Sequence, residues 1–322
     1  MTLDSQNIMQ VIRDFPKQCR EALSLPQGIS VSEEISNIVV IGMGGSAMGG
    51  DLLKIYLSNT NIPVYVNRDY KVPNFVDENT LVFAVSYSGN TEETLAALAD
   101  AKEKKAKIIG ITSGGKLVDE CEKIIQIPSG LQPRAALGYL FFPMLGILHN
   151  SNIIRVKNDE LNEVMGILKQ TDKFNDMGEE LSKQLKDKIP IIYASEALGP
   201  IAFRWKTQIN ENAKMPAFYN VFSEMNHNEI AGYKGMDRKF AAVILRDKHD
   251  NDRIKKRMDV CKEIMEVNVD VIEVHTEGDS LLARMFSAIY LGDFVSYYLA
   301  VWNRADPGPV EIIEEMKGKI VE

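Results

Sequence analysis

Ser86, Ser88 and Thr91 offer three hydroxyl groups within one short stretch of the chain. The apolar run Leu81–Val85 comes directly before them, which indicates a buried strand, a tight turn and a helix beginning near Thr91. Gly89 in the turn allows a ligand to approach the backbone. The first amides of a helix lack intrahelical acceptors and carry partial positive charge, so this turn predicts an anion site. Without a P-loop lysine, it favours one phosphate on a small molecule over a nucleoside triphosphate. The alternative is an ordinary capped helix, since Ser and Thr are common caps.

A second turn, Gly42–Ser46, is rich in glycine and follows the apolar segment Asn37–Ile41. It begins a GxGxxA pattern, which is loosely typical of dinucleotide-binding folds. Those folds place an acidic residue about twenty residues further along, and Asp69 comes later than that. Alternatively, the backbone amide of Gly45 and the hydroxyl of Ser46 face a ligand oxygen, or the glycines serve only to make a tight turn.

The elements that must position these turns alternate between strands and helices. The expected strands are 37–41, 64–66, 81–85, 107–112 and 124–127. One expected helix follows the glycine-rich turn and ends near 57, and two others span 91–104 and 135–149. This alternation predicts α/β architecture with a doubly wound parallel sheet, covered by helices on both faces. The carboxyl ends of parallel strands meet at one edge, so the two turns are expected to converge on one small ligand.

The second half of the chain repeats this architecture without clear sequence identity. A polar helical stretch, 159–188, bridges the halves; strands then follow at 189–194, 240–245 and 270–275, and helices at 200–212, 251–266, 281–303 and 309–320. We therefore expect two doubly wound domains, 1–155 with an N-terminal helical lead-in and 156–322 with the bridging helices and a C-terminal helix.

Composition excludes several classes of protein. The formal net charge of -8 disfavours a general nucleic-acid surface, which would need basic residues. Cys19, Cys121 and Cys261 are far apart, which indicates a reducing, cytoplasmic setting without a disulfide framework. No apolar stretch reaches transmembrane length, and the N-terminus lacks the pattern of a signal peptide. The 4 histidines form no HxH or HExxH arrangement, so we expect no tightly held zinc.

Four more residues could move protons or stabilise charge. Glu211 stands in a polar cluster after an apolar helical run. His227 stands in a polar loop, and histidine is the side chain most often used for proton transfer. Arg134 precedes an apolar helix, where its positive charge is unfavourable with respect to the helix dipole, and this favours a functional role over a structural one. Lys317 lies on the last helix with Lys319 as a nearby competitor. Each also has an ordinary explanation as a solvated surface group.

Together these motifs carry a resemblance. The segments that carry it are Gly42–Ser46, Ser86–Thr94, Gln132–Arg134, Asn210–Lys214 and His227–Ile230. The Ser86–Thr94 stretch looks like the phosphosugar-binding signature of sugar isomerase (SIS) domains. In this order, the segments resemble the bifunctional phosphoglucose/phosphomannose isomerases, a two-SIS-domain family of the phosphoglucose isomerase superfamily whose domains are flavodoxin-like.

This resemblance implies interconversion of glucose 6-phosphate and mannose 6-phosphate with fructose 6-phosphate through a cis-enediol(ate), without a cofactor or metal. Such chemistry needs one base that reaches two adjacent carbons, a charge-stabilising group and an acid or base that opens the sugar ring. By resemblance, Glu211 is the base and Arg134 stabilises the intermediate. His227, from the neighbouring subunit of a homodimer, and Lys317 open the ring.

The resemblance also distributes the binding roles. Ser86, Ser88 and Thr91 would hold the phosphate, while Gly45 and Ser46 would contact sugar oxygens. Three alternatives stay open: another SIS-type phosphosugar isomerase, a non-catalytic phosphosugar sensor, and nicotinamide-dependent redox chemistry, which rests only on the GxGxxA pattern.

Overall fold

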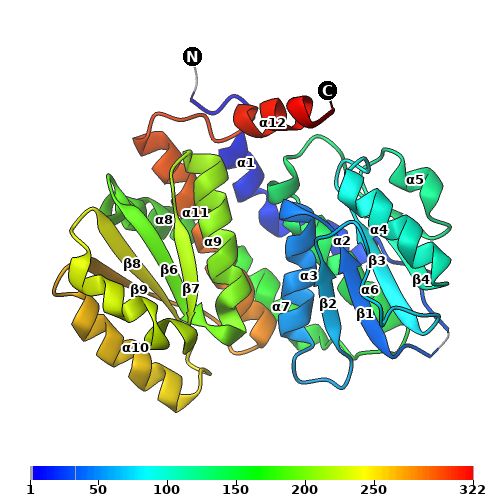
Figure 1. Cartoon of the computed structure of the whole chain (residues 1–322), viewed down its shortest axis with the longest axis horizontal. Coiled ribbons are helices and arrows are strands. Elements are labelled where there is room, and N and C mark those ends of the chain that lie inside the picture. The colour runs from blue at the N-terminus through cyan, green and yellow to red at the C-terminus, as the bar shows by residue number, and fades with distance from the viewer. Residues whose placement is uncertain (1–2, 33, 322) are drawn as a thin grey trace. The chain divides into compact units, whose positions relative to one another are not determined.

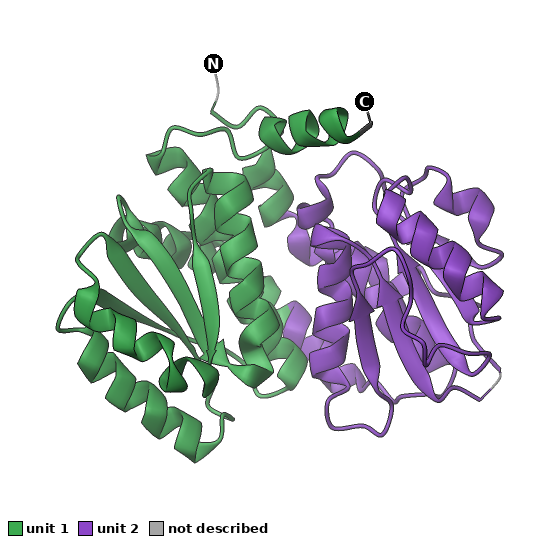
Figure 2. Cartoon of the chain, in the orientation of Figure 1, with its two compact units in different colours: residues 1–13, 166–322 green, residues 14–165 purple. Residues whose placement is uncertain are grey.

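The computed structural model describes residues 3–32 and 34–321, and Figure 1 shows their helices and strands. By internal contacts the chain divides into two compact units, one of residues Asp14–Met165 and one of Met1–Arg13 with Gly166–Glu322 (Figure 2). The domains 1–155 and 156–322 expected from the sequence follow the repeat of the strand–helix pattern instead, and they stay a prediction.

The unit formed by residues 14–165 is built on a five-stranded, fully parallel sheet of order β2-β1-β3-β4-β5. Its strands are β1 (Asn37–Ile41), β2 (Val64–Asn67), β3 (Thr80–Val85), β4 (Lys107–Thr112) and β5 (Ile124–Gln126). Its helices are α2 (Phe15–Ser24), α3 (Gly44–Tyr56), α4 (Glu92–Glu103), α5 (Leu117–Glu120), α6 (Leu137–Asn150) and most of α7 (Asn158–Leu168), with the 3₁₀ turn η1 (Pro133–Ala135). The expected doubly wound parallel sheet is confirmed.

Burial explains why these segments form these elements. Every residue of the central strand β3 is buried, as its unbroken apolar sequence predicts for a strand covered on both faces. Helix α6 is apolar on all sides and almost wholly buried. Its Gly138 lies against Gln18 and Cys19 of α2, which makes α6 the inner helix on which the N-terminal lead-in packs.

The other unit contains a four-stranded parallel sheet of order β7-β6-β8-β9. Its strands are β6 (Ile189–Ser195), β7 (Phe218–Phe222), β8 (Phe240–Arg246) and β9 (Asp270–His275). Its helices are α1 (Ile8–Arg13), α8 (Thr171–Leu185), α9 (Gly199–Ala213), α10 (Asp252–Met265), α11 (Leu281–Trp302) and α12 (Glu311–Val321), with 3₁₀ segments η2 (Glu196–Leu198), η3 (Glu224–His227) and η4 (Glu229–Gly235).

Two features of this unit differ from the sequence-based expectation. Strand β7 was not predicted, because it is an edge strand whose Phe218 and Tyr219 remain exposed beside the polar Asn220. The polar stretch expected as one helical region is divided into α7 and α8 around Lys169 and Gln170.

Helix α11 is the centre of this unit. It is buried along most of its length, and Gly292 lets the Trp205 indole of α9 approach closely, while the indole N–H donates to the Ala288 carbonyl at 2.9 Å. A buried ion pair between Arg204 and Asp293, 2.8 Å apart, also joins α9 to α11. The apolar residues of α11 therefore form core.

The two sheets correspond strand by strand in their order. When the two strand orders are aligned with β1 at the position of β6, β2 corresponds to β7, β3 to β8 and β4 to β9, while β5 has no counterpart. The carboxyl edges of the two sheets can therefore be compared position by position. Within the described residues, we find no helix that is long and apolar enough to span a bilayer.

Candidate active site

The glycine-rich turn after β1 touches the backbone at Arg134. Gly44 has a φ of +51°, and α3 begins there. A Cβ atom at Gly45 would lie 2.7 Å from the Arg134 nitrogen and 2.8 Å from its Cα atom, far inside normal contact. Glycine at position 45 therefore allows the β1–α3 turn and the segment beyond β5 to meet.

The loop after β3 is held in shape by its own hydroxyl groups. Ser86 and Thr91 share a hydrogen bond of 2.9 Å between their side-chain oxygens, and the Gly89 amide donates to Ser86 Oγ at 3.1 Å. The Asn90 amide donates to Ser88 Oγ at 3.3 Å. Ser86 is buried, whereas Ser88 is exposed, so the loop has a fixed base and an open rim.

Helix α4 starts at this loop and supplies further donors. Thr91 is its N-cap residue, but the Thr91 hydroxyl meets Ser86 and does not cap the helix amides. The first backbone bond of the helix runs from the Leu95 amide to the Thr91 carbonyl, at 3.0 Å. The amides before Leu95 therefore have no acceptor within the helix, and together with the hydroxyls they form an anion-binding arrangement.

Tyr87 joins three loops at this edge. Its amide donates to Ser46 Oγ at 3.1 Å, which links the β3 loop to the β1 turn. Its phenol donates to the Pro128 carbonyl at 2.9 Å and accepts from the Leu131 amide at 2.8 Å, which fixes the segment leading to Arg134. Burial raises the pKa of the Tyr87 phenol, so it stays a protonated donor.

Sequence reasoning did not assign the residues that follow β4. Ser113 Oγ donates to the Tyr87 carbonyl at 2.6 Å, and Thr112 Oγ1 donates to the Gly114 carbonyl at 2.7 Å. A Cβ at Gly89, whose φ is +69°, would stand 1.7 Å from that Gly114 oxygen. The Thr-Ser-Gly-Gly run after an apolar strand was the available signal, because it repeats the pattern of the other two turns.

Arg134 is the charged group of this edge. It belongs to the 3₁₀ turn η1, only 4% of its surface is exposed, and its Nη1 donates to Gln132 Oε1 at 3.3 Å. A buried guanidinium suits a negatively charged or strongly polarised oxygen. The unit of residues 14–165 thus brings together all the residues predicted to bind phosphate and sugar, and Arg134 with them.

Glu211 lies in the last turn of α9, between two anchored neighbours. The Asn210 side chain donates to the Met215 carbonyl at 2.9 Å, and the Asn212 side chain donates to Ser296 Oγ at 2.9 Å. Lys214 ends the helix in the left-handed conformation with a φ of +54°, and its ammonium group donates to the Glu211 carbonyl. The backbone around Glu211 is therefore held firmly, and its partly exposed carboxylate extends from this fixed point.

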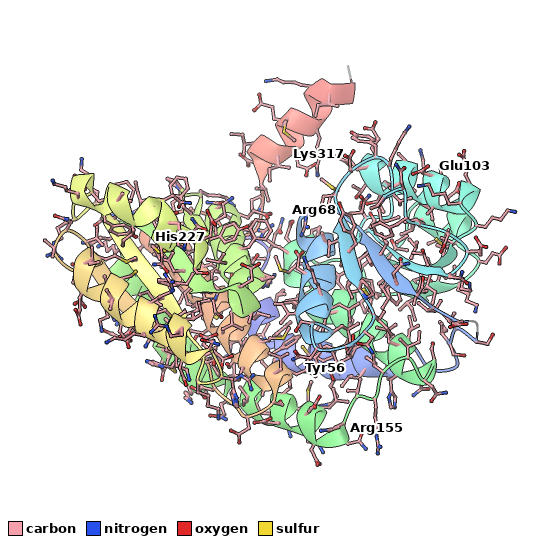
Figure 3. All side chains as sticks on the ribbon, turned by 60° about the horizontal axis from the view of Figure 1, so that its bottom comes forward. Tyr56, Arg68, Glu103, Arg155, His227 and Lys317 are labelled. Atoms are coloured by element: carbon pink, nitrogen blue, oxygen red, sulfur yellow. The ribbon has the colours of Figure 1, made fainter. Side chains whose placement is uncertain are left out.

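Lys317 lies on the same edge of its sheet as Glu211. Helix α11 ends where α9 ends, because the Asn303 side chain donates to the Ala213 carbonyl at 2.9 Å, and α12 follows α11. Lys317 is exposed on α12 and pairs with Glu314 at 3.0 Å (Figure 3), while Lys319 pairs with Glu315 at 2.5 Å. Each lysine pairs with a neighbour on its own helix, so neither is distinguished by its packing.

His227 lies at the opposite edge of the sheet. It ends the 3₁₀ segment η3, which follows the carboxyl end of β7, and it is exposed (Figure 3). Glu211 ends α9, a helix of 15 residues that starts at the carboxyl edge and runs back to the amino edge. At 1.5 Å per residue, α9 separates these two edges by roughly 20 Å. This unit therefore does not bring His227 and Glu211 of one chain together.

No metal centre accompanies these residues. Across residues 3–32 and 34–321, no three His, Cys, Asp or Glu side chains are grouped in a way that could hold an ion.

Comparisons with known proteins agree with this architecture. The profile of the SIS domain matches residues 33–142, and that of the bacterial phospho-glucose isomerase C-terminal SIS domain matches residues 174–320. The fold is similar to the C-terminal domain of glucosamine-fructose-6-phosphate aminotransferase from Francisella tularensis, with a TM-score of 0.76 at 15% identity, covering 95% of this chain and 98% of that one. The predicted SIS-type fold is confirmed.

Curated relatives resolve the family. The chain is 45% identical to the bifunctional phosphoglucose/phosphomannose isomerase of Caldicellulosiruptor bescii, over 98% of this chain and 99% of that protein. It is 42% identical to the protein of the same name from Thermoplasma acidophilum, over 88% of this chain and 90% of that protein. The resemblance read from the sequence motifs is thereby confirmed: the chain belongs to the family of bifunctional phosphoglucose/phosphomannose isomerases.

Proposed function

We propose that this protein interconverts glucose 6-phosphate and mannose 6-phosphate with fructose 6-phosphate through a cis-enediol(ate). The observation that supports the proposal is that the Gly45–Ser46 turn, the Ser86–Thr91 loop and the backbone of Arg134 meet at one sheet edge. That edge offers donors for a phosphate, and the buried Arg134 side chain is a cation suited to an oxyanion. A sugar monophosphate carries both groups on one small molecule.

The binding and chemical roles divide between these loops. Ser86, Ser88 and Thr91, with the first amides of α4, hold the phosphate, which fixes the sugar at a distance from the reacting carbons. Gly45 and Ser46 contact sugar oxygens. Arg134 stabilises the negative charge that develops on O1 and O2 when a proton leaves C1 or C2.

Glu211 acts as the base that moves this proton. A carboxylate on an anchored helix end can accept the proton from one carbon and return it to the neighbouring carbon. Acceptance of both C2 epimers requires rotation about C2–C3 of the open-chain intermediate. The ring must first open, a proton transfer that we assign to His227 and Lys317, with Lys319 as the alternative lysine.

We further propose a homodimer in which His227 serves the site of the neighbouring subunit. The separation of Glu211 and His227 to opposite edges of one sheet supports this arrangement, since one chain cannot present both to a single sugar. The relatives are named as metabolic enzymes, and Cys19, Cys121 and Cys261 form no disulfide, which also favours a cytoplasmic enzyme without a cofactor.

The primary experiment measures both isomerase activities by coupled assays with glucose 6-phosphate and mannose 6-phosphate, with and without EDTA. We expect turnover of both sugars, unaffected by the chelator. Glucosamine 6-phosphate serves as a third substrate for the aminosugar alternative. Binding of the sugar phosphates without turnover would instead identify a phosphosugar sensor, and turnover of the aminosugar alone would identify another SIS-type enzyme.

Mixed dimers test the shared site. Glu211→Gln and His227→Ala chains are each expected to be strongly impaired but still measurable, and unfolding and refolding them together creates dimers with one intact site. Random pairing should restore about a quarter of the wild-type activity, because half of the dimers are mixed and each has one complete site. No recovery in verified mixed dimers, or an active monomer in sedimentation, would contradict the cross-subunit role.

A further inference from the structure

The segment that carries His227 is irregular, yet its residues are tethered on both sides of the histidine. The Asn226 side chain donates to the buried Cys261 Sγ at 2.8 Å. The Asn228 side chain accepts from the Glu229 amide at 2.6 Å and donates to Glu224 Oε1 at 2.6 Å. An exposed imidazole between such anchors is held at its backbone, although the chain there forms neither an α-helix nor a strand.

The Glu229 carboxylate is the strongest of these anchors. One of its oxygens accepts from the Tyr193 phenol in a very short contact, and the other accepts from the Asn220 side chain at 2.5 Å. Tyr193 belongs to β6 and Asn220 to β7. Both carboxylate oxygens are therefore used to bind the segment to two neighbouring strands of the sheet.

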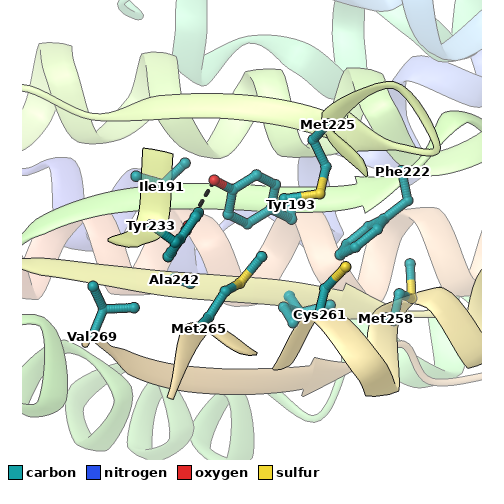
Figure 4. Close-up of a cluster of buried hydrophobic side chains, with 11 residues drawn as sticks. Ile191, Tyr193, Phe222, Met225, Tyr233, Ala242, Met258, Cys261, Met265 and Val269 are labelled. Atoms are coloured by element: carbon teal, nitrogen blue, oxygen red, sulfur yellow. Dashed lines mark hydrogen bonds between the residues drawn. The ribbon is translucent and has the colours of Figure 1, made fainter. Parts of the chain in front are cut away.

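The tyrosine that holds Glu229 is itself fixed in the core. Tyr193 and Tyr233 are fully buried and share a hydrogen bond of 2.7 Å between their phenol oxygens, drawn in Figure 4. They lie in a cluster with Met225, Phe222 and Cys261, which packs beneath the same segment. Burial raises the pKa of both phenols, so Tyr193 remains protonated and keeps donating to the carboxylate.

We propose that Glu229 is a positioning residue, which holds the η3–η4 segment so that His227 is presented at a fixed place for sugar-ring opening. The proposal rests on the proposed function of His227. A buried, charge-assisted network of this kind rigidifies its surroundings only while every member is satisfied. The catalytic imidazole can then remain free of bonds that would compete with the sugar, because its neighbours provide the rigidity.

The first test is kinetic. Glu229→Ala is expected to lower kcat for glucose 6-phosphate by about tenfold to hundredfold with little change in KM, since a small misplacement of a catalytic group carries such a cost. Glu229→Gln keeps one acceptor oxygen and should restore part of the rate. Tyr193→Phe removes the donor to Glu229 and the hydrogen-bond partner of the Tyr233 phenol, and it should cause a smaller loss of the same kind.

A double-mutant cycle separates positioning from general weakening. If Glu229 acts through His227, adding Glu229→Ala to His227→Ala should cause no further loss of kcat. Losses that multiply in the double variant would show that Glu229 acts independently of His227, and would overturn the proposal. The isomerase activity of the wild-type protein, measured in the same assay, remains a separate test of the proposed function.

An open-chain substrate sharpens the result. 5-Deoxyfructose 6-phosphate has no 5-hydroxyl group and cannot close its ring, so it bypasses ring opening. Glu229→Ala should turn it over at the wild-type rate, whereas Glu211→Gln should not. An equal loss on closed and open substrates would contradict the proposed role.

Tyr56→Phe is the matched control for Tyr193→Phe. Tyr56 also donates a phenol hydrogen bond to a glutamate, Glu160 Oε2 at 2.9 Å, but at the end of α3 far along the helix from the glycine turn. Tyr56→Phe should change neither kcat for glucose 6-phosphate nor the ratio of this kcat to that for 5-deoxyfructose 6-phosphate. If it lowers kcat as much as Tyr193→Phe does, the effect of Tyr193 is one of stability and not of positioning.

Discussion

The carboxyl edges of the two sheets have the same topology and opposite chemistry. In the unit of residues 14–165, β1, β3 and β4 end in glycine and hydroxyl residues whose bonds join one loop to the next. In the other unit, the corresponding strand β8 ends in a turn that carries Asp247 and Asp250. The first edge presents donors to an anion, whereas the second edge carries two acidic side chains.

The second edge is also neutralised from within. Arg284, near the start of α11, donates from Nε to Asp247 Oδ2 at 2.9 Å and from Nη1 to the Asp279 carbonyl. Arg284 and Asp247 are 7% and 6% exposed, so this pair is part of the interior. The position that would face a ligand in the first sheet is occupied here by the protein's own ions.

This difference agrees with a division of tasks between the two sheets. In the proposed function, the unit of residues 14–165 binds the ligand at its carboxyl edge, and the other unit provides chemical groups from other places. Glu211 comes from the end of a helix at the opposite edge, and His227 from the segment after β7. The predictions below follow from this division, from the largest expected effect to the smallest.

Glu211→Gln is expected to have the largest effect on catalysis. Loss of a positioned base should lower kcat by about 10²–10⁴-fold and leave the binding of fructose 6-phosphate nearly unchanged, because the amide keeps the shape of the side chain. Coupled assays give kcat, and calorimetry gives the affinity of the inactive variant. A near-normal rate would show that the base is another residue.

Glu196→Gln is the control at the other end of the same helix region. Glu196 is exposed in η2, where the second sheet has its carboxyl edge. If that edge has no catalytic task, this variant should keep the wild-type rate. A comparable loss at Glu196 would contradict the division of tasks between the two edges.

Arg284→Met should reduce stability and not substrate binding. Removal of one partner from a buried ion pair leaves the Asp247 carboxylate uncompensated, which costs about 3–5 kcal/mol in the free energy of unfolding. Urea unfolding monitored by circular dichroism measures this loss. KM, measured at urea concentrations well below the unfolding transition, should stay within about twofold of the wild-type value, because Arg284 does not contact the substrate in the proposed site. A KM that rises without a loss of stability would assign the second edge to substrate binding.

Ser86→Ala, at the first edge, should weaken substrate binding more than it weakens stability. Hydrogen bonds to charged groups contribute about 1.5–3 kcal/mol, so KM for both sugar 6-phosphates should rise about tenfold to hundredfold. Ser195→Ala, which removes a buried hydroxyl at the end of β6, is the matched control and should leave KM unchanged. Equal effects of the two variants on KM would contradict the conclusion that only the first edge binds substrate.

The sequence predicted the first edge far better than it predicted the second. Buried parallel strands need apolar residues, and tight turns favour glycine and hydroxyl residues. Apolar runs that end in such residues therefore indicate both the strands and the ligand loops. The tyrosine at position 87 looks like a spacer in the motif, and only its bonds to Ser46, Pro128 and Leu131 reveal that it joins the loops.

The unit with the β7-β6-β8-β9 sheet was harder to predict because its features depend on contacts between distant residues. The exposed edge strand β7 has no apolar alternation, so its place beside β6 could not be inferred from composition. Asp247 and Arg284 are far apart in the chain, and nothing local indicates that they pair. The Glu229 network likewise joins three elements through side chains whose partners the sequence does not show.

Asp250 gives the smallest expected effect, and one that depends on pH. Burial raises the pKa of its carboxyl group, despite a hydrogen bond from the Asp247 amide at 3.3 Å. A raised native pKa means that the folded protein holds this proton more tightly than the unfolded chain does. Ionised Asp250 therefore lowers stability at neutral pH, and this loss is relieved as the pH falls through the native pKa.

Asp250→Asn should consequently raise the free energy of unfolding at pH 7, by less than Arg284→Met lowers it, and the gain should shrink on acidification. Ser86→Ala removes no ionisable group at the corresponding edge, so its effect on stability should stay constant over the same pH range. Urea unfolding at a series of pH values measures both. If the gain from Asp250→Asn grew on acidification, the folded protein would be favouring the carboxylate, and the second edge would then attract cations through Asp250 as well as being neutralised by Arg284.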